Sequence, residues 1–574
     1  MASSGVQTSR LRFVRDLGLL LPAAALVLGP VGFLAWMGLG GGIGDLVVRT
    51  HDLGILPTVG RVFLLAAATT LMAAIMGVPL AWLMVRSDLP GRRLIRWLAP
   101  LPLAIPPYIG ALVYQIVCAP SGSLNAILTW SLDLPPDSRI VSIYGIPGAA
   151  WVLSLFCFPY IFLLVAGALE RMNPSLEEAA RAAGMSRWTV FSRVTLPMLR
   201  PAIGGGGLMV FLYAWADFGV VSLLRVRTIT TMVFDYVQGT MDWTIPAGLS
   251  VFLTLITTAV LAVQLRFLGR GRYTQVSSAS RPIGPVPLGR WRIPAMLFGV
   301  LVLLCSLGMP LGVLAFRASR LSVSAASAFL SQQSSFIGNS VWTAASGATV
   351  ASVLALVIGW LQARHRIGRG VSAMFQVGYA IPGTVLGLGM VGFFHAALPW
   401  LYGSPIVLIL GYLVLFVTPA IQGTGAALAQ ISPSLEEAAR GLGRGPLATF
   451  REVTFPLVRP GLVAAWVLVF MLCMRELAAT LILRPPGFDT LPVRIWIHTM
   501  DVGPVPTAAL LALVLVAIVA VPWLALVTFD RAAYGVGAAQ RTPVTSSSGH
   551  LAAESPRAAA DAQPEGAHAV PYRS

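Results

Sequence analysis

The stretch Pro174–Pro201 reads PSLEEAARAAGMSRWTVFSRVTLPMLRP, and the stretch Pro433–Pro460 reads PSLEEAARGLGRGPLATFREVTFPLVRP. The two copies align without a gap at an offset of 259 residues, and 15 of their 28 positions are identical. An internal repeat of this quality indicates two copies of one structural unit. The chain is therefore expected to consist of two related halves.

Each copy predicts a short helix, a turn and a second short helix. Ser175 stands three residues before Glu178, which is the spacing of a capping box at a helix start. Gly184 is suited to the left-handed turn that ends such a helix. Pro197 is expected to end the second helix, because proline lacks the N–H that a helix interior needs. The second copy repeats these positions as Ser434, Glu437, Gly443 and Pro456.

The remainder of the chain is strongly apolar. Of its 574 residues 56% are hydrophobic and only 11% are charged, and the mean hydropathy is +0.80. Soluble proteins carry about 25% charged residues. This composition excludes a cytosolic globular enzyme, a disordered chain and a secreted disulfide scaffold. It predicts an all-α polytopic membrane protein.

Apolar runs long enough to cross a bilayer occur six times in each half. In the first half (1–268) they lie at about 17–39, 58–85, 94–118, 147–169, 202–224 and 245–268. In the second half (294–529) they lie at about 294–316, 339–363, 371–397, 404–430, 461–483 and 506–529. Residues 269–293 are expected to be a cytoplasmic linker, and residues 530–574 a disordered cytoplasmic tail.

The even number of spans makes the two halves parallel in the membrane, and arginine orients them. With a cytoplasmic N-terminus, 29 of the 39 arginines fall in cytoplasmic segments. Both copies of the repeated stretch then lie on the cytoplasmic side, as do both termini. We therefore expect a pseudo-twofold axis along the membrane normal, with a pathway between the halves.

The chain contains no lysine. A phosphate-binding P-loop and a Schiff base both require one, so any ATP hydrolysis must occur on another polypeptide. The four cysteines form no Cys-x-x-Cys pair, and the six histidines form no metal-binding pair. The sequence therefore predicts no catalytic residue, no metal site and no cofactor bound by this chain.

The repeated stretches resemble the EAA loop of binding-protein-dependent ABC importer permeases. The family pattern is Glu-Ala-Ala, three residues, Gly, nine residues, and Ile-x-Leu-Pro. The first EAA loop (170–201) matches it with Glu178-Ala179-Ala180, Gly184 and Val194-Thr195-Leu196-Pro197. The second EAA loop (431–460) matches it with Glu437-Ala438-Ala439, Gly443 and Val453-Thr454-Phe455-Pro456. Valine replaces isoleucine in both copies, and Phe455 departs from leucine but keeps its apolar character.

The resemblance implies a type I ABC importer permease fold with about twelve spans in two parallel six-helix repeats. It implies that the chain lies in the bacterial inner membrane and binds two copies of a cytoplasmic ABC ATPase, which holds the ATP and magnesium. It also implies a periplasmic substrate-binding protein and no nucleic acid partner. The ATPase-coupling residues would be Glu177, Glu178, Ala179, Ala180, Gly184 and Pro197, with Glu436, Glu437, Ala438, Ala439, Gly443 and Pro456.

The second half is similar to fused ferric-iron permeases over Met474–Gly487, Thr490-Leu491 and Arg494–Trp496. Asp217-Phe218-Gly219, near the end of the fifth span, is also similar to them. Ferric iron is therefore the expected cargo. Fused permeases for thiamine, other organic cations or phosphonates share much of this pattern and remain alternatives.

Three charged residues fall inside predicted spans. Asp217 and Glu476 occupy equivalent positions in the two halves, and Arg475 precedes Glu476. Ionisable groups in a membrane usually face a bundle interior or a cavity. One hypothesis is that the three line the translocation pathway, where carboxylates would suit a trivalent iron ion. The other is a structural ion-pair set between the halves, for example Asp217 with Arg475.

Two further patterns concern helix shape. Prolines in the third span (Pro100, Pro102, Pro106 and Pro107) and Pro382 in the ninth predict kinks, which could act as gates. The run Gly204–Gly207 predicts close helix packing or a hinge rather than a phosphate loop.

Two other function classes stay open at this stage. They are an ion-gradient-driven secondary transporter and a membrane-bound enzyme, although few buried acids and no catalytic pair support them.

Overall fold

The computed structural model describes residues 22, 25–40, 54–135, 138–172, 174–239, 243–268, 285–364, 375, 378, 381–501, 503 and 505–539. The chain divides into two compact units, residues 1–526 and 527–574, and the packing below concerns the first. Most of the predicted linker (269–284) and of the predicted tail (540–574) lies outside the described residues, as does the beginning of the first span.

The first half opens with a helix at Ala25–Gly38. It continues with α3 (Ile55–Arg86), α4 (Arg92–Leu98), η1 (Leu101–Ala104), α5 (Pro107–Cys118), α6 (Ser123–Ser131), α7 (Ile146–Arg171), α8 (Pro174–Ala182), α9 (Arg187–Val190), η2 (Phe191–Thr195), α10 (Leu196–Ala216), α11 (Gly219–Leu223), α12 (Ile229–Gly239) and α13 (Thr244–Leu268).

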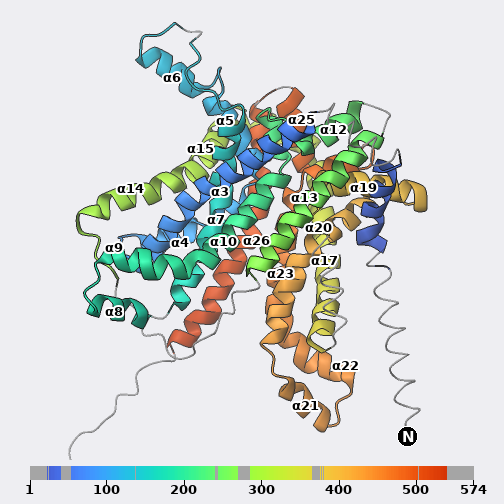
Figure 1. Ribbon diagram of the computed structural model, residues 1–574. Helices are drawn as coiled ribbons and strands as arrows, with labels where there is room; N and C mark the ends of the chain where they lie inside the picture. The colour runs from blue at the N-terminus through green and yellow to red at the C-terminus, as the bar shows by residue number, and fades with distance from the viewer. Residues whose placement is uncertain are drawn as a thin grey trace, which may run out of the picture. The chain divides into compact units, whose positions relative to one another are not determined.

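The second half follows the same order (Figure 1). It contains η3 (Gly289–Trp291), α14 (Arg292–Leu303), η4 (Leu304–Gly308), α15 (Met309–Ala318), α16 (Val323–Gln332), α17 (Ser334–Arg364), α19 (Gly383–Ala397), α20 (Pro405–Ala429), α21 (Pro433–Gly441), α22 (Pro446–Thr449), η5 (Phe450–Thr454), α23 (Phe455–Arg475), α24 (Ala478–Leu483), α25 (Leu491–Asp501) and α26 (Pro506–Ala539). The last helix passes the expected start of the tail at residue 530.

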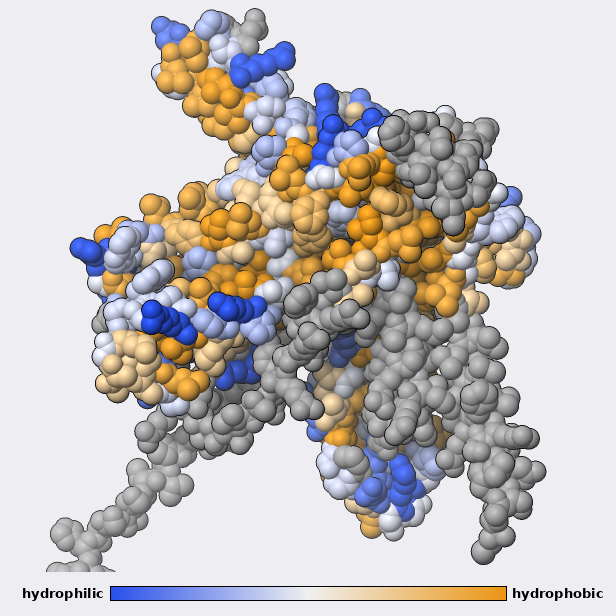
Figure 2. Space-filling model, in the orientation of Figure 1, coloured by the Kyte–Doolittle hydropathy of each residue, from blue (hydrophilic) through white to orange (hydrophobic). Residues whose placement is uncertain are grey.

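The predicted all-α membrane architecture is confirmed. In the described part of the chain, ten helices are long and apolar enough to cross a membrane. Two shorter apolar helices, Ala25–Gly38 and Gly383–Ala397, lie at the predicted first and ninth spans. Apolar side chains point outward from the long helices, among them Phe63 and Leu71 of α3 and Leu297 of α14. Figure 2 shows such residues gathered across this face, as a lipid-facing surface requires.

The two halves are built alike. In the first, α3, α7 and α10 pack against one another, and in the second α17, α20 and α23 do so. Small residues permit the close approach, as is usual between membrane helices. A Cβ on Gly206 would lie 2.8 Å from the Ile161 Cα, and one on Gly77 would lie 3.0 Å from the Phe158 carbonyl oxygen. The packing role predicted for the Gly204–Gly207 run is therefore confirmed at Gly206.

The first span of each half packs on the opposite half. The helix Ala25–Gly38 lies against α19, where a Cβ on Gly389 would lie 2.8 Å from the Pro30 carbonyl oxygen (Figure 1). Conversely, α14 packs against α3 and α4, and α15 packs against α5. The Tyr114 hydroxyl of α5 donates to the Cys305 carbonyl at 3.1 Å. The halves are thus interlocked by an exchange of helices.

The third span differs from a continuous helix over 94–118. It is divided into α4, η1 and α5, and α5 begins at Pro107. The four prolines of residues 100–107 remove four backbone donors in succession, so no regular helix can run through them. The predicted kink is confirmed, and the same break occurs in the second half, where α19 begins directly after Pro382.

The fifth and eleventh spans are placed differently from the predictions at 202–224 and 461–483. Helical structure suited to a membrane runs over Trp188–Ala216 and Pro446–Arg475. Each helix then stops, at Asp217 and at Glu476, where the backbone becomes extended. Apolarity alone predicted spans that run through these positions. Both membrane helices instead end at an acidic residue, whose side chain accepts hydrogen bonds from the backbone that follows.

One segment of the first half has no counterpart. The helices α5 and α7 are separated by α6 and its flanking loops, residues 119–145, whereas α19 and α20 are separated only by residues 398–404. The α6 segment lies on the opposite side of the spans from α8 and α21 (Figure 1). Ile127 and Trp130 are exposed on it.

Candidate functional site

The helices α8 and α21 carry the repeated Leu-Glu-Glu-Ala-Ala motif and lie on one side of the spans (Figure 1). Each is short and amphipathic, and each is followed by a tight turn and the next membrane helix. The acid and first alanine of the motif (Glu178 and Ala179, Glu437 and Ala438) are exposed. The second alanine is turned further inward, since Ala180 is half-buried and Ala439 is buried. Each helix therefore presents one acid and one small side chain outward.

The preceding glutamate of each motif points inward instead. Glu177 is 6% exposed, and its Oε1 accepts a hydrogen bond from the Thr195 hydroxyl at 2.8 Å. Its Oε2 accepts one from Arg181 at 3.1 Å. A buried carboxylate is stable only when its oxygens are satisfied in this way. Glu177 therefore attaches α8 to the turn that begins the following membrane helix.

The second loop repeats this arrangement. Glu436 is 3% exposed, its Oε1 accepts from the Thr454 hydroxyl at 2.9 Å, and its Oε2 accepts from Arg440 at 3.3 Å. The two adjacent glutamates of each motif thus have different surroundings. Their threonine partners lie 18 residues further along the chain, and the sequence analysis did not identify them.

The predicted glycine turns are present. Gly184 and Gly443 both have φ of +81°, in the left-handed region. The Met185 amide donates to the Ala180 carbonyl at 3.1 Å, and the Arg444 amide donates to the Ala439 carbonyl at 3.1 Å. These bonds complete the Schellman motif that ends each helix. An added Cβ at either glycine meets no atom within 4 Å, so the backbone conformation, not space, selects glycine.

The predicted capping boxes are wrong. The second helix begins at Pro433, and its cap is Ser432, whose hydroxyl accepts from the Ser434 amide. Ser434 is therefore the second residue of the helix. The first helix begins at Pro174, so Ser175 is likewise inside it. The proline explains the shift, because its fixed φ and missing N–H suit the first helical position.

The predicted end of the second short helix at Pro197 and Pro456 is also wrong. Helical structure continues from α9 through η2 into α10, and from α22 through η5 into α23. Both η2 and η5 are single π turns, in which the Leu196 amide donates to the Phe191 carbonyl and the Phe455 amide to the Phe450 carbonyl. The wider turn places each proline at the start of a new α-helix, where no donor is required.

Exposed apolar side chains surround the outward-facing acids. Leu176 and Trp188 are 49% and 74% exposed on the first loop, and Leu435 and Leu447 are 48% and 79% exposed on the second. Equivalent positions of the two loops thus carry equivalent surfaces. Exposed apolar groups with a polar rim are typical of protein–protein contact sites. These four side chains were not predicted as site residues, although the repeat gives apolar residues at the same positions of both copies.

The acids inside the membrane cap short helices. Asp217 Oδ2 accepts hydrogen bonds from the Val220 and Val221 amides, at 2.9 and 3.2 Å, at the start of α11. Glu476 Oε1 accepts from the Ala479 amide at 2.9 Å at the start of α24. A carboxylate there satisfies backbone donors and complements the helix dipole. The equivalence predicted from the repeat therefore extends to the same structural role.

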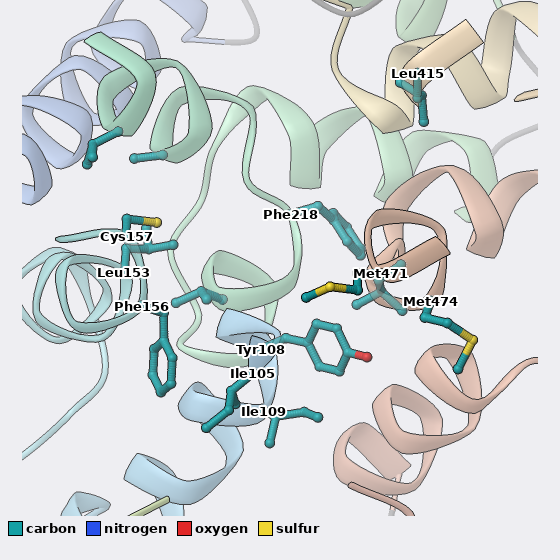
Figure 3. Close-up of a cluster of buried hydrophobic side chains, with 14 of the residues drawn as sticks. Ile105, Tyr108, Ile109, Leu153, Phe156, Cys157, Phe218, Leu415, Met471 and Met474 are labelled. Atoms are coloured by element: carbon teal, nitrogen blue, oxygen red, sulfur yellow. The ribbon is translucent and has the colours of Figure 1, made fainter. Parts of the chain in front are cut away.

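These two breaks face one another between the halves. A Cβ on Gly219 would lie 3.4 Å from Leu477 Cδ2, so the residues that follow the two acids are close. Tyr108 and Phe218 of the first half share a core with Met471 and Met474 of the second (Figure 3). Apolar side chains therefore close the space between the halves beside the two carboxylates.

Arg475 joins the halves without pairing with Asp217. Its guanidinium donates to the Leu103 carbonyl of η1, in the broken third span of the first half. The ion pairs found among the described residues do not include one between Arg475 and Asp217. A carbonyl freed by the proline run thus replaces the carboxylate as the partner.

Comparison with known proteins gives a consistent result. A family model described as "Binding-protein-dependent transport system inner membrane component" matches residues 73–270 and again 347–532. The two matches contain the two EAA loops and the two intramembrane acids. They confirm the internal repeat and the type I permease fold.

Several curated relatives are similar over much of the chain. The Fe(3+)-transport system permease protein FbpB 2 of Haemophilus influenzae is 28% identical over 79% of this chain and 89% of its own length. The ferric transport system permease protein FbpB of Actinobacillus pleuropneumoniae is 25% identical over 67% of this chain and 58% of its own length. A putative 2-aminoethylphosphonate transport system permease protein of Salmonella typhimurium is 36% identical over 26% of this chain and 56% of its own length.

The family match covers more than half of the chain and falls on both repeats. Permeases of this family are multi-spanning inner membrane transport subunits that work with an ATPase and a substrate-binding protein. The chain therefore belongs to the inner membrane components of binding-protein-dependent transport systems, the permease subunits of ABC importers.

Proposed function

We propose that this chain is the membrane-spanning translocation subunit of an ATP-driven importer for ferric iron. The observation that carries the proposal is the pair of matching EAA loops on one side of the molecule. Each loop has its own inward anchor (Glu177 or Glu436), its own glycine turn and its own exposed surface. Two equivalent docking surfaces on one chain suit two copies of one ATPase subunit.

The docking chemistry follows from what each loop exposes. Glu178 and Glu437 would pair with basic groups of the ATPase, while the exposed alanines permit close approach. The exposed Leu176, Trp188 and their counterparts would fill apolar pockets beside these ion pairs. ATP and magnesium would be bound by the ATPase subunits. The arginine distribution supports a cytoplasmic location for these loops and for both termini.

Movement would pass from the loops to the spans through the inward glutamates. Glu177 bonds to Thr195 in the π turn η2, which is continuous with the membrane helix α10. Glu436 does the same through Thr454 and α23. When the two ATPase subunits close on ATP, α10 and α23 would be drawn together. The opposite ends of these two helices, at Asp217 and Glu476, would change their separation as the helices move.

The cargo proposal rests on the ferric names of the long relatives and on the two carboxylates between the halves. Hard oxygen donors suit a trivalent cation passing from a periplasmic binding protein. Thiamine or another small solute, including a phosphonate, is the alternative within the same architecture. A secondary transporter would require a proton or sodium site instead of the ATPase.

The test is uptake of labelled ferric iron by cells with and without the gene, in iron-poor medium. We expect uptake to be lost in the deletion strain and restored by the wild-type chain. If the deletion strain takes up ferric iron normally but loses thiamine or phosphonate uptake, the ferric cargo is wrong and the ABC importer mechanism stands. Transport that persists after cellular ATP is depleted would remove the ABC mechanism.

A further inference from the structure

The last residue of α3 carries a buried guanidinium that no group in the described part of the chain satisfies. Arg86 is 4% exposed, yet its Nε and both terminal nitrogens make no hydrogen bond to any residue that the structure describes. Its nearest acid is Glu177, at 3.8 Å from Nη2 to Oε1, which is an ion pair too long for a hydrogen bond. Burying a charge without hydrogen bonds is strongly unfavourable.

The guanidinium borders a cavity of about 130 Å³. Its lining residues come from α3, the first EAA loop and the end of the linker between the halves: Trp82, Arg86, Glu177, Arg181, Val190, Phe191, Thr195, Pro285, Val286 and Pro287. Two of the charged side chains are cationic and one is anionic. The cavity, which is partly open to solvent, therefore carries a net positive charge that favours an anion.

The acid in the wall already has two hydrogen-bond partners. Glu177 Oε1 accepts from Thr195 and its Oε2 accepts from Arg181. Its oxygens have room for further hydrogen bonds, but Oε1 lies 3.8 Å from Arg86 Nη2, so Arg86 gains a charge interaction from Glu177 and no hydrogen bond. Arg181 is 43% exposed along its side chain, so it can turn toward a guest in the cavity.

At the described end of the linker, both backbone groups of Val286 bond to the backbone of the α3 end and not to the Arg86 side chain. The Val286 amide donates to the Arg86 carbonyl at 2.8 Å, and the Val286 carbonyl accepts from the Asp88 amide at 3.2 Å. Asp88 Oδ1 accepts from the Leu288 amide, and its Oδ2 accepts from Arg292. The hydrogen bond from the Leu288 amide, and to a smaller extent the one from Arg292, hold the pKa of Asp88 below its ordinary value. The Asp88 carboxylate therefore stays charged at neutral pH.

We propose that this cavity binds a phosphate-class oxyanion, held by Arg86 and Arg181. A tetrahedral oxyanion supplies the several acceptor oxygens that a guanidinium fork requires. About 130 Å³ is room for such an ion, or for about four water molecules at roughly 30 Å³ each. The ion would join α3, the first EAA loop and the linker, and so fix the position of that loop.

The same chemistry could come from free phosphate or from a phospholipid headgroup, since Arg86 is the last residue of a helix apolar enough to cross a membrane. The experiment uses the purified full-length chain in detergent. One arm measures retention of radiolabelled inorganic phosphate by equilibrium dialysis. The other measures retained anionic and zwitterionic lipids by native mass spectrometry.

Arg86→Gln should weaken binding about tenfold or more, the loss expected for charge-assisted hydrogen bonds to a buried group. Arg96→Gln is the matched control, because it removes an equal charge on the neighbouring α4, outside the cavity. If Arg86→Gln fails to fold, Arg181→Gln replaces it, with Arg440→Gln as its counterpart in the second loop.

Three outcomes decide the proposal. If Arg86→Gln or Arg181→Gln reduces phosphate retention and the control variants do not, the proposal is supported and the ligand is a soluble anion. If anionic lipid is retained selectively, and the same variants reduce its retention, the proposal is supported and the ligand is a lipid headgroup. If neither is retained, or if the controls lose binding equally, the cavity holds only water and the proposal is overturned. These readouts do not depend on the cargo.

Discussion

Glu177 and Glu178 are neighbours in the sequence with opposite surroundings, and so are Glu436 and Glu437. The first of each pair is buried against a threonine and an arginine, and the second faces solvent. Adjacent helical residues lie about 100° apart around the axis, so one can point into the protein while the next faces solvent. We therefore separate an anchoring glutamate from a docking glutamate in each loop.

The first prediction concerns the anchoring role. Glu436→Ala leaves the Thr454 hydroxyl and Arg440 without their partner, so it should cost about 1.5–3 kcal/mol of stability. Glu437→Ala removes an exposed charge and should change stability by no more than about 0.5 kcal/mol. The midpoint of unfolding of each purified variant measures this. Equal shifts in the two variants would contradict the distinction.

The second prediction concerns the carboxylates between the halves. Asp217→Asn keeps an acceptor for the Val220 and Val221 amides, whereas Asp217→Ala loses the cap at a cost of about 1 kcal/mol. If the negative charge contacts a ferric ion, the asparagine variant should fold normally but lose uptake. Glu476→Gln is its partner in the second half. Wild-type uptake by both amide variants would leave only the capping role.

The sequence indicated candidate residues for these sites, but not the different contacts that the structure gives them. The repeat made Asp217 and Glu476 equivalent, and the structure gives them the same capping role. The burial of Glu177 depends on Thr195, a partner 18 residues away whose position is set by the π turn. No local pattern in the Leu-Glu-Glu-Ala-Ala motif contains that contact.

The elements themselves were largely predictable, while their interruptions were not. Apolar runs gave the long helices, because crossing a bilayer requires about 20 apolar residues. The prediction failed where a proline or an acid changes the hydrogen bonding of the backbone. Pro197 was expected to stop a helix, yet the π turn η2 lets the helix continue. Asp217 was read as part of a span, yet it ends α10 and starts α11.

The third prediction concerns the glycine turn of the second loop. Gly443→Val forces a β-branched residue to φ near +81°, which costs about 1–2 kcal/mol or distorts the turn. Because Gly443 sets the exit from α21, we expect less ATPase to copurify with the variant. Gly441→Ala, two residues earlier and in open space, should copurify normally. Normal ATPase binding by Gly443→Val would show that the turn does not position the loop.

The exchange of first spans is a property of the whole molecule that the sequence analysis did not predict. Hydropathy locates spans but carries no information about which half a span packs against. The helix Ala25–Gly38 packs on α19, and the α14–α15 segment packs on α3, α4 and α5. Each half therefore depends on the other to bury its helices.

The fourth prediction follows from this exchange. The chain is divided within the linker, into residues 1–276 and 277–574, and the fragments are produced separately or together. Either fragment alone should aggregate or be degraded, because it exposes the apolar surface on which the first span of the other fragment packs. The two together should copurify as one particle. A stable, monodisperse single fragment would argue against an interlocked molecule.

The central claim is that one chain offers two equivalent docking surfaces to an ATPase. The measurement that tests it most directly is the mass of the detergent-solubilised complex purified through this chain from its own cells, by native mass spectrometry. The account predicts the 60.7 kDa chain with two identical ATPase subunits, and a mass lower by one or both subunits when Glu178 and Glu437 are replaced by arginine. A complex with a single ATPase subunit, or with none under conditions that preserve transport, would contradict it.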